Sequence, residues 1–325
     1  MADPVADWRG ARLRSARDLA PDIRLFEIEP ERAFVPPTPG GYIDVMVQAG
    51  ERADVRSYSL VGPCGDGLYR IAVKRLRDSR GGSAYLWTLS PGARLTIAGP
   101  GNHFELGRGR PDYLLVAGGI GITPIYTMAL ALAEAGAPFR LLYACRRRQD
   151  LALAPELRER IGDRLELFVS EEGTRINFDR EIGRLGPRGE LYVCGPIPMM
   201  DAAKGAWRRS GRPPDQLRFE TFGSSGRFAA EPFTVRIPRL GREITVALNQ
   251  TMLEALEAAG VEVMFDCRRG ECGLCALDIL EVDGVVDHRD VFFSDEEKAT
   301  NAKLCACVSR VAGGSISVDT ADRPV

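Results

Sequence analysis

The sequence predicts three modules of different fold class along its 325 residues: an antiparallel β-barrel, a parallel α/β sheet and a small C-terminal module rich in cysteine. Short apolar or alternating runs separated by Pro/Gly-rich turns fill residues 1–106. Strand-like and helix-like runs alternate over 107–225, and five of the eight cysteines lie within 41 residues near the C-terminus. We therefore expect domains at 1–106, 107–225 and 233–325, with 226–232 as a linker.

The barrel is predicted from short strands at regular spacing. Turns at 35–41 and 62–67 separate the runs. The expected strands cover 24–29, 41–47, 68–75 and 94–98.

The middle module reads as a parallel α/β sheet because each apolar strand is followed by a helical stretch. Its first strand runs into Gly118-Gly119-Ile120-Gly121, after which Thr123 is expected to cap a helix whose first residue is Pro124. The expected strands cover 113–117, 140–144, 165–169 and 191–194.

The last module begins with a predicted strand pair and continues with a helix before the cysteine loop. A second short helix is predicted because Ser294 and Glu297 form a capping box. The strands cover 233–237 and 243–247, and the first helix covers 251–259.

Composition excludes several classes of protein. Hydrophobic content of 45% and charge of 27% describe an ordinary globular protein. The chain has no apolar window long enough to span a membrane, and its first residues carry no apolar signal core. No basic stripe with interleaved aromatics favours nucleic acid. Cysteines without a signal peptide point to a reducing cytoplasm.

Charge is unevenly distributed behind the net value of −2. Residues 233–325 hold 10 Lys and Arg against 16 Asp and Glu, whereas the rest of the chain holds 33 against 29. An acidic C-terminal module beside a mildly basic body indicates docking between modules or onto a protein partner, or else simply a solvated acidic surface.

The cysteine run is the strongest chemical signal. The spacing Cys267-x4-Cys272-x2-Cys275, with further cysteines at Cys305 and Cys307, is that of a plant-type [2Fe–2S] site. Gly270 and Gly273 would let the backbone fold close to the sulfides. The alternatives are a zinc site or buried free thiols. Zinc sites usually pair C-x2-C units, often with histidine, and His288 is the one histidine in this region.

Two glycine-containing turns are predicted at the carboxyl ends of parallel strands. Gly118–Gly121 opens a helix whose N-terminus can receive a pyrophosphate, and Cys194-Gly195-Pro196 precedes another helix. In an open α/β sheet both would face one crevice. A plain tight turn and a small buried thiol are the alternatives.

The barrel carries a further pair of polar motifs. Arg56-Ser57-Tyr58-Ser59-Leu60 lies on a predicted strand, and Gly81-Gly82-Ser83 precedes a predicted helix at 83–89. Tyr58 can stack on a planar ring, Arg56 can hold an anion, and the glycines with Ser83 offer a second phosphate-sized helix terminus. Alone, these residues would be barrel core and a turn.

These motifs, in this order, resemble those of the ferredoxin–NADP⁺ reductase superfamily. With the cysteine module at the C-terminus, the chain is similar over nearly its whole length to the phthalate dioxygenase reductase family, which includes vanillate demethylase reductases. The resemblance implies a flavin-binding β-barrel, a nucleotide-binding α/β domain and a β-grasp ferredoxin domain. It also implies NADH, FMN and a [2Fe–2S] cluster as cofactors.

The resemblance assigns roles residue by residue. The flavin contacts would be Arg56, Tyr58, Ser59, Gly82 and Ser83. The residues that contact the nicotinamide nucleotide would be Gly119, Gly121, Thr123, Glu172, Cys194 and Gly195. Lys74 would be a further cofactor-binding residue. The residues nearest the reacting atoms would be Thr123, Cys194, Glu220 and Phe222, the last two within the segment Phe219–Phe222.

The expected function is a reductase that passes electrons from NADH through FMN and the cluster to a Rieske-type oxygenase acting on an aromatic or related compound. We expect it to be cytoplasmic and monomeric. An FAD-containing reductase of a diiron monooxygenase and a non-catalytic flavin/iron–sulfur redox sensor are the alternatives. The C-terminal position of the ferredoxin module argues against the first.

Nucleotide preference and the fourth cluster ligand remain to be chosen. Glu171 and Glu172 favour a ribose diol over a 2′-phosphate, whereas Arg146-Arg147-Arg148 would bind that phosphate if they point inward. They would otherwise be a solvated strand end.

Family spacing would select Cys305 as the fourth ligand. In the resembled family the fourth ligand is followed by x-Ser-Arg, and only Cys307 fits this pattern, through Val308, Ser309 and Arg310. The stretch after Cys275 would then be two residues longer than in relatives, and we place the extra residues in a hairpin around Asp283-Gly284. A shift of two residues would leave Cys305 on the same strand face. We predict Cys307.

Overall fold

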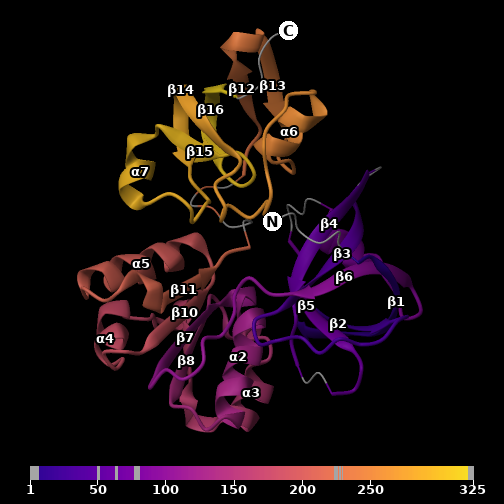
Figure 1. Cartoon of the computed structure of the whole chain (residues 1–325), viewed down its shortest axis with the longest axis vertical. Helices are drawn as coiled ribbons and strands as arrows, with labels where there is room; N and C mark the ends of the chain where they lie inside the picture. The colour runs from indigo at the N-terminus through magenta and orange to yellow at the C-terminus, as the bar shows by residue number, and fades with distance from the viewer. Residues whose placement is uncertain are drawn as a thin grey trace. The chain divides into compact units, whose positions relative to one another are not determined.

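A computed structural model describes residues 7–49, 52–62, 65–76, 81–222, 226, 228 and 230–320. The chain forms two compact units, residues 1–220 and 221–325. The first unit holds two β-sheets and the second holds one (Figure 1).

The N-terminal sheet is a six-stranded antiparallel barrel in the order β4-β3-β6-β1-β2-β5. A β-bridge between Leu60 and Ile71 connects the two end strands. Alternate residues such as Ile43, Val45 and Val47 fill the interior. Its elements are β1 Arg9–Ala20, β2 Ile23–Pro30, β3 Tyr42–Ala49, β4 Arg52–Ser59, β5 Tyr69–Lys74, α1 Gly82–Thr88 and β6 Arg94–Gly101.

The second sheet is parallel and five-stranded, in the order β11-β10-β7-β8-β9. Helices α2 and α3 cover one face, and α4 and α5 cover the other (Figure 1). Its elements are β7 Tyr113–Gly118, α2 Ile122–Glu134, β8 Phe139–Cys145, α3 Ala154–Ile161, β9 Leu165–Val169, α4 Phe178–Gly183, β10 Glu190–Cys194, α5 Ile197–Arg209 and β11 Leu217–Glu220.

The barrel and the parallel sheet share one hydrophobic cluster. Barrel residues Ile23, Leu25 and Phe104 pack in it together with Leu115 and Met128 of the α/β module. This common core explains why the two sheets form a single unit rather than two.

The second unit contains a mixed five-stranded sheet in the order β13-β12-β16-β14-β15, with a core of its own. Capping boxes at Thr251 and Ser294 begin its two helices. Its elements are β12 Phe233–Ile237, β13 Arg242–Val246, α6 Met252–Ala258, β14 Ala276–Asp287, α7 Asp295–Thr300, β15 Lys303–Cys305 and β16 Arg310–Asp319.

Three local predictions were wrong. Helix α2 begins at Ile122 with Gly121 as its N-cap, so Thr123 lies inside the first turn. Asp283-Gly284 is no hairpin, because β14 runs through it with an irregular register against β16. Strand β15 ends at Cys305, so Cys307 lies in the following turn rather than on the same strand.

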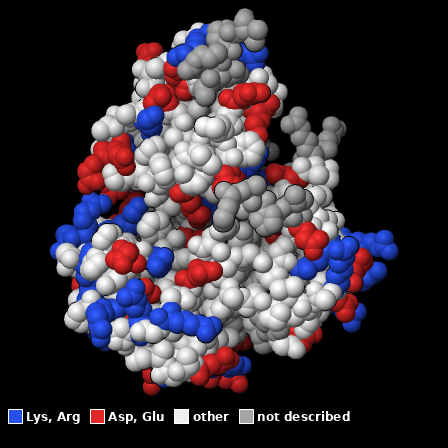
Figure 2. Space-filling view, in the orientation of Figure 1, with Lys and Arg blue, Asp and Glu red and all other residues white. Residues whose placement is uncertain are grey.

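Charge differs between the two units as the composition predicts. Acidic side chains gather near α7 in the second unit (Figure 2), where Asp295, Glu296 and Glu297 form the first turn of that helix. Basic side chains gather over α4 and α5 of the first unit. No helix in the described residues is long and apolar enough to cross a membrane.

Candidate functional site

The two glycine turns of the parallel sheet touch each other, as the sequence predicts. A Cβ added to Gly121 would lie 2.2 Å from the Cys194 carbonyl oxygen, and one added to Gly195 would lie 3.1 Å from the Gly118 Cα. Gly119 has a φ of +55° and open space beside it. The turns therefore form one crevice edge along which a ligand backbone can approach closely.

Two side chains at this edge were assigned to chemistry. Thr123 is buried, and its hydroxyl donates to the Ile120 carbonyl at 3.0 Å, so in the described state it holds the glycine turn. Cys194 is fully buried at the end of β10. Met199, which sequence reasoning missed, lies against Gly118 and Gly195. The available signal was its place in the first turn of α5, shortly after the Cys194-Gly195-Pro196 motif.

The opposing charges predicted at the ends of β8 and β9 pair with each other. Arg148 donates twice to the Glu172 carboxylate, at 2.8 and 2.5 Å, and the Arg146 Nε donates to Glu171 at 3.1 Å. The third arginine, Arg147, pairs with Asp150 instead. Each of these arginines is thus paired with a carboxylate, and the side chains of Arg146 and Arg148 are also largely exposed to solvent.

Titration follows this pairing. The hydrogen bond from Arg148 holds the pKa of Glu172 below its ordinary value, and the same contact raises the pKa of Arg148. Both groups therefore stay charged at neutral pH.

The barrel motifs meet at the start of α1. A Cβ on Gly82 would lie 2.7 Å from the Arg56 Cγ and 3.2 Å from the Tyr58 hydroxyl. Arg56 pairs with Asp54 at 2.5 Å, and burial raises the pKa of Tyr58, which keeps its hydroxyl neutral. Ser59 and Ser83 are both buried. The strand motif and the glycine motif thus form one site, and Gly82 admits no side chain there.

Lys74 ends β5, which contacts the 3₁₀ turn Gly119–Gly121. Its ammonium lies 3.4 Å from the Asp22 carboxylate. Lys74 thus belongs to the seam between the barrel and the crevice edge.

Glu220 and Phe222 lie on either side of the division between the two units. Glu220 is buried and pairs in register with Cys194 on the neighbouring strand. Phe222 is the second residue of the second unit and is 36% exposed. Their predicted proximity to a flavin stays a prediction.

The cysteine loop wraps its sulfur atoms in backbone amides. The N–H groups of Arg269 and Glu271 both lie 3.4 Å from the Cys267 Sγ. Gly270 and Gly273 have φ of +76° and +75°, and a Cβ on Gly273 would lie 2.3 Å from the Phe292 ring. Both glycines are therefore required by the loop, as the sequence predicts.

Cys272 is half-buried, whereas Cys275, Cys305 and Cys307 form a buried group of thiols. Hydrogen bonds from Cys305 and Cys307 lower the pKa of Cys275 to about 3, while the contact with Cys275 and burial raise the pKa values of Cys305 and Cys307. Beside these larger effects, the charge of Cys267 raises the pKa of Cys307 and the Gly270 backbone amide lowers it.

Cys305 faces a different neighbour. The contact with Cys275 and burial raise the pKa of Cys305, and the Asp290 carboxylate raises it further. Thiolate stabilised by N–H groups is the chemistry that an iron–sulfur cluster needs, so the loop residues fit such a group. Within the residues that the structure describes, no group of three His, Cys, Asp or Glu side chains is arranged so that it could hold a single metal ion.

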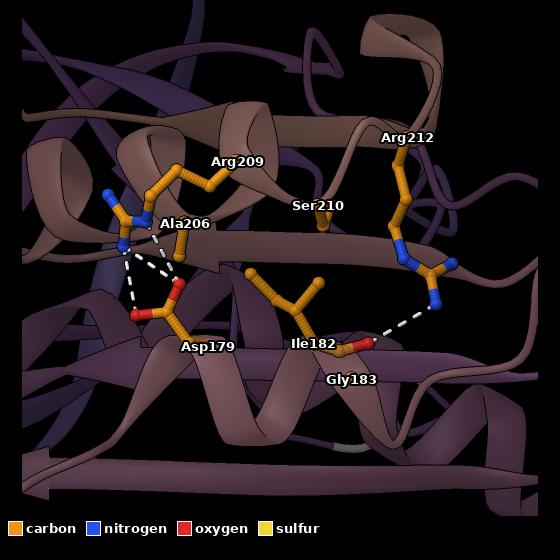
Figure 3. Close-up of a pocket in the computed structure, with 7 residues that line it drawn as sticks. All are labelled: Asp179, Ile182, Gly183, Ala206, Arg209, Ser210 and Arg212. Atoms are coloured by element: carbon orange, nitrogen blue, oxygen red, sulfur yellow. Dashed lines mark hydrogen bonds and ion pairs between the residues drawn. The ribbon is translucent and has the colours of Figure 1, made fainter.

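A separate hollow lies between α4 and α5 (Figure 3). Asp179 accepts from Arg209 at 2.8 Å, and Arg212 donates to the Ile182 carbonyl at 3.2 Å. None of the predicted site residues lines it. Because its two arginines are already satisfied by these partners, it is not part of the candidate site.

Two family profiles match the chain. An oxidoreductase NAD-binding domain matches residues 115–205, and a 2Fe-2S iron-sulfur cluster binding domain matches residues 235–312. The matched ranges contain the glycine turns of the parallel sheet and all five clustered cysteines.

Relatives match over nearly the whole chain. A phenoxybenzoate dioxygenase subunit beta of Ectopseudomonas oleovorans is 38% identical over 92% of this chain and 93% of its own length. A heme-dependent oxidative N-demethylase beta subunit of Ectopseudomonas mendocina is 35% identical over 95% and 97%. A solved phthalate dioxygenase reductase, described as transferring electrons from pyridine nucleotides to [2Fe–2S], is 31% identical. The two structures superpose with a TM-score of 0.73, and the match covers 96% of this chain and 98% of the reductase.

Proposed function

The chain belongs to the phthalate dioxygenase reductase family of oxygenase reductases, and we propose that it delivers electrons from NADH to a Rieske-type terminal oxygenase. It is an oxidoreductase with NAD and a [2Fe–2S] cluster among its cofactors. The observation that carries the proposal is the union, in one chain, of a nucleotide-binding edge and an amide-wrapped cysteine loop.

The cofactors supply the redox chemistry: nicotinamide gives two electrons together, flavin can release them singly, and the cluster accepts one at a time. The chain's own residues bind and orient. Gly119 and Gly121 would leave room for a pyrophosphate. Cys194 and Gly195 would line the nicotinamide end of the same edge. Arg56, Tyr58, Ser59, Gly82 and Ser83 hold the flavin.

The flavin is proposed to be FMN rather than FAD. Gly82 and Ser83 give a compact phosphate site beside Tyr58, and family membership favours the mononucleotide. Chromatography of acid-extracted flavin tests this. An extract that runs as FAD would contradict it and favour the diiron monooxygenase reductase.

Cys307 is proposed as the fourth ligand after Cys267, Cys272 and Cys275. Its support is the Val308-Ser309-Arg310 sequence that follows it and the closeness of its turn to the loop, because a Cβ on Gly270 would lie 2.7 Å from the Val308 Cγ2. Cys305 would then be a buried neighbour. Ligand substitution tests this, as the Discussion sets out.

The identity of the oxygenase needs a direct test, because one relative is a subunit of a haem-dependent enzyme and another of a dioxygenase. The purified chain and NADH would be mixed anaerobically with a Rieske-type oxygenase or with a haem N-demethylase catalytic subunit. We expect the Rieske absorbance to bleach faster than the haem spectrum changes. Faster haem reduction would overturn the Rieske assignment and leave the reductase function intact.

A redox sensor would bind the same cofactors without turnover. Sustained NADH-dependent reduction of ferricyanide is expected from a reductase, and its absence would favour the sensor. We further propose that the chain is a cytoplasmic monomer with domain boundaries near residues 106, 225 and 232, and limited proteolysis with sizing chromatography tests the last two points.

A further inference from the structure

The ends of β8 and β9 carry a charge pair whose position bears on nucleotide choice. Arg148 lies just after β8 and Glu172 just after β9, and β8 and β9 are parallel neighbours with Cys145 in register with Val169. The Glu171 amide also donates to the Arg146 carbonyl at 3.1 Å, which holds the two strand exits together.

The order of strands says which part of a dinucleotide reaches this pair. Strands β10, β7, β8 and β9 follow one another across the sheet, and their carboxyl ends form one edge. If the nicotinamide lies at Cys194 on β10 and the pyrophosphate at Gly119 after β7, the adenosine half extends toward β8 and β9. The 2′ position of that ribose therefore falls near Arg148 and Glu172.

The ion pair between Arg148 and Glu172 costs little free energy to separate. Arg148 is 65% exposed and Glu172 is 44% exposed, so solvent screens their attraction and competes for both groups. The contact is nevertheless bidentate, at 2.8 and 2.5 Å, which leaves the guanidinium fork occupied. A phosphate would need that same fork.

We propose that Glu172 is the residue that excludes NADPH, because it occupies Arg148, and that Arg148 is a latent ligand for a 2′-phosphate. The inference rests on the proposed reductase function and on nucleotide binding at this edge. Simple repulsion of a 2′-phosphate by Glu172 would not involve Arg148. In this proposal, by contrast, the gain in NADPH use on removing the Glu172 carboxylate depends on Arg148.

The experiment uses the whole holoprotein with Glu172→Gln, with Arg148→Gln and with the double variant. Asp179→Asn is the matched control, since Asp179 forms an exposed pair with Arg209 through both carboxylate oxygens, at 2.8 and 2.9 Å, outside the nucleotide edge. Two quantities are measured: kcat/KM for NADH and NADPH with ferricyanide, and the affinity for 2′,5′-ADP by calorimetry, which needs no turnover.

We expect Glu172→Gln to raise kcat/KM for NADPH and the affinity for 2′,5′-ADP by at least about tenfold. Asp179→Asn should change both by less than about threefold. The double variant should lose the gain. A gain of equal size in the double variant, or none in Glu172→Gln, overturns the role of Arg148.

The proposed function fails in a different way. A wild-type preference for NADPH would overturn the nucleotide assignment, and absence of ferricyanide turnover in the wild type would overturn the reductase. Wild-type selectivity for NADH with an unresponsive Glu172→Gln would overturn this inference alone.

Discussion

The nucleotide edge and the cysteine loop hold their ligands by opposite means. The edge ends in exposed, mutually paired side chains such as Arg148 and Glu172. The loop turns backbone amides toward the half-buried Cys267 sulfur, next to the buried thiols of Cys275 and Cys307. The difference matches residence time: a nucleotide exchanges at every turnover, so its site costs little to open, whereas a cluster stays and its site is part of the core.

The largest effect should come from removing a sulfur of the loop. Cys307→Ser is expected to lose most of the iron, the sulfide and the visible absorbance of the cluster, because oxygen replaces one of four thiolates. Reduction of an oxygenase should fail, while NADH-dependent reduction of ferricyanide by the flavin survives. Iron content and absorbance spectra measure the first effect.

Cys305→Ser is the matched control, since Cys305 is equally buried and two residues away. It should keep a normal cluster. Loss of the cluster in Cys305→Ser but not in Cys307→Ser would reverse the ligand assignment.

Filling the nucleotide edge should have the next largest effect. Gly121→Ala places a Cβ against the Cys194 carbonyl, and the overpacking should cost about 2 kcal/mol of unfolding free energy and raise KM for NADH. Gly183→Ala, at the end of α4 with no atom within 4 Å, is the control and should be neutral. Urea unfolding and NADH titration measure both, and equal effects in the two variants would argue against the close approach.

A buried carboxylate sharpens the comparison with Glu172. Glu181 is fully buried and pairs with Arg140, Arg180 and Arg184. Glu181→Gln leaves those charges uncompensated and should lower the unfolding free energy by about 2 kcal/mol. Asp179→Asn, which breaks the exposed pair with Arg209, should change it by less than about 1 kcal/mol. Similar losses in both would mean that burial does not govern these pairs.

The same carboxylate predicts a direction with pH. Burial raises the pKa of Glu181, but the hydrogen bonds from Arg140 and Arg180 outweigh it and hold the pKa below the ordinary 4.5. Its contribution to stability is therefore complete above about pH 4.5 and is lost as the pH falls through the lower folded value. Urea midpoints measured from pH 6 down to 3 should show a steeper decline for the wild type than for Glu181→Gln.

The smallest effect on stability is expected at the nucleotide edge itself. Glu172→Gln should leave the melting temperature unchanged, because the pair with Arg148 is exposed to solvent. Calorimetry measures this. A clear drop in melting temperature would show that the pair supports the fold and would weaken its reading as a specificity element.

Local patterns predicted much of the fold because strands and turns are local. The apolar strand before Gly118 and the spacing around Cys272 were enough to predict the parallel sheet and the cysteine loop. Strand β1 was missed because its pairing with β2 shifts register near Leu13 and again near Asp18, which interrupts the alternation of side chains. Asp283-Gly284 has the composition of a turn, but pairing with β16 continues β14 through it.

Long-range features escaped prediction for a different reason. Arg148 and Glu172 are 24 residues apart in sequence, and their contact depends on two strands ending side by side. The shared core of barrel and α/β module likewise depends on tertiary packing, which no local window contains. Residue types at the site were thus predictable, whereas their partners were not.

The hydrophobic cluster shared by the two sheets of the first unit makes the chain unequally divisible. Cutting near residue 106 would strip Ile23, Leu25 and Phe104 of the apolar surface that covers them. The second unit keeps all of its core within its own residues. Recombination between related genes is therefore free to exchange the cysteine module as a cassette, while the barrel and the α/β module must be inherited together.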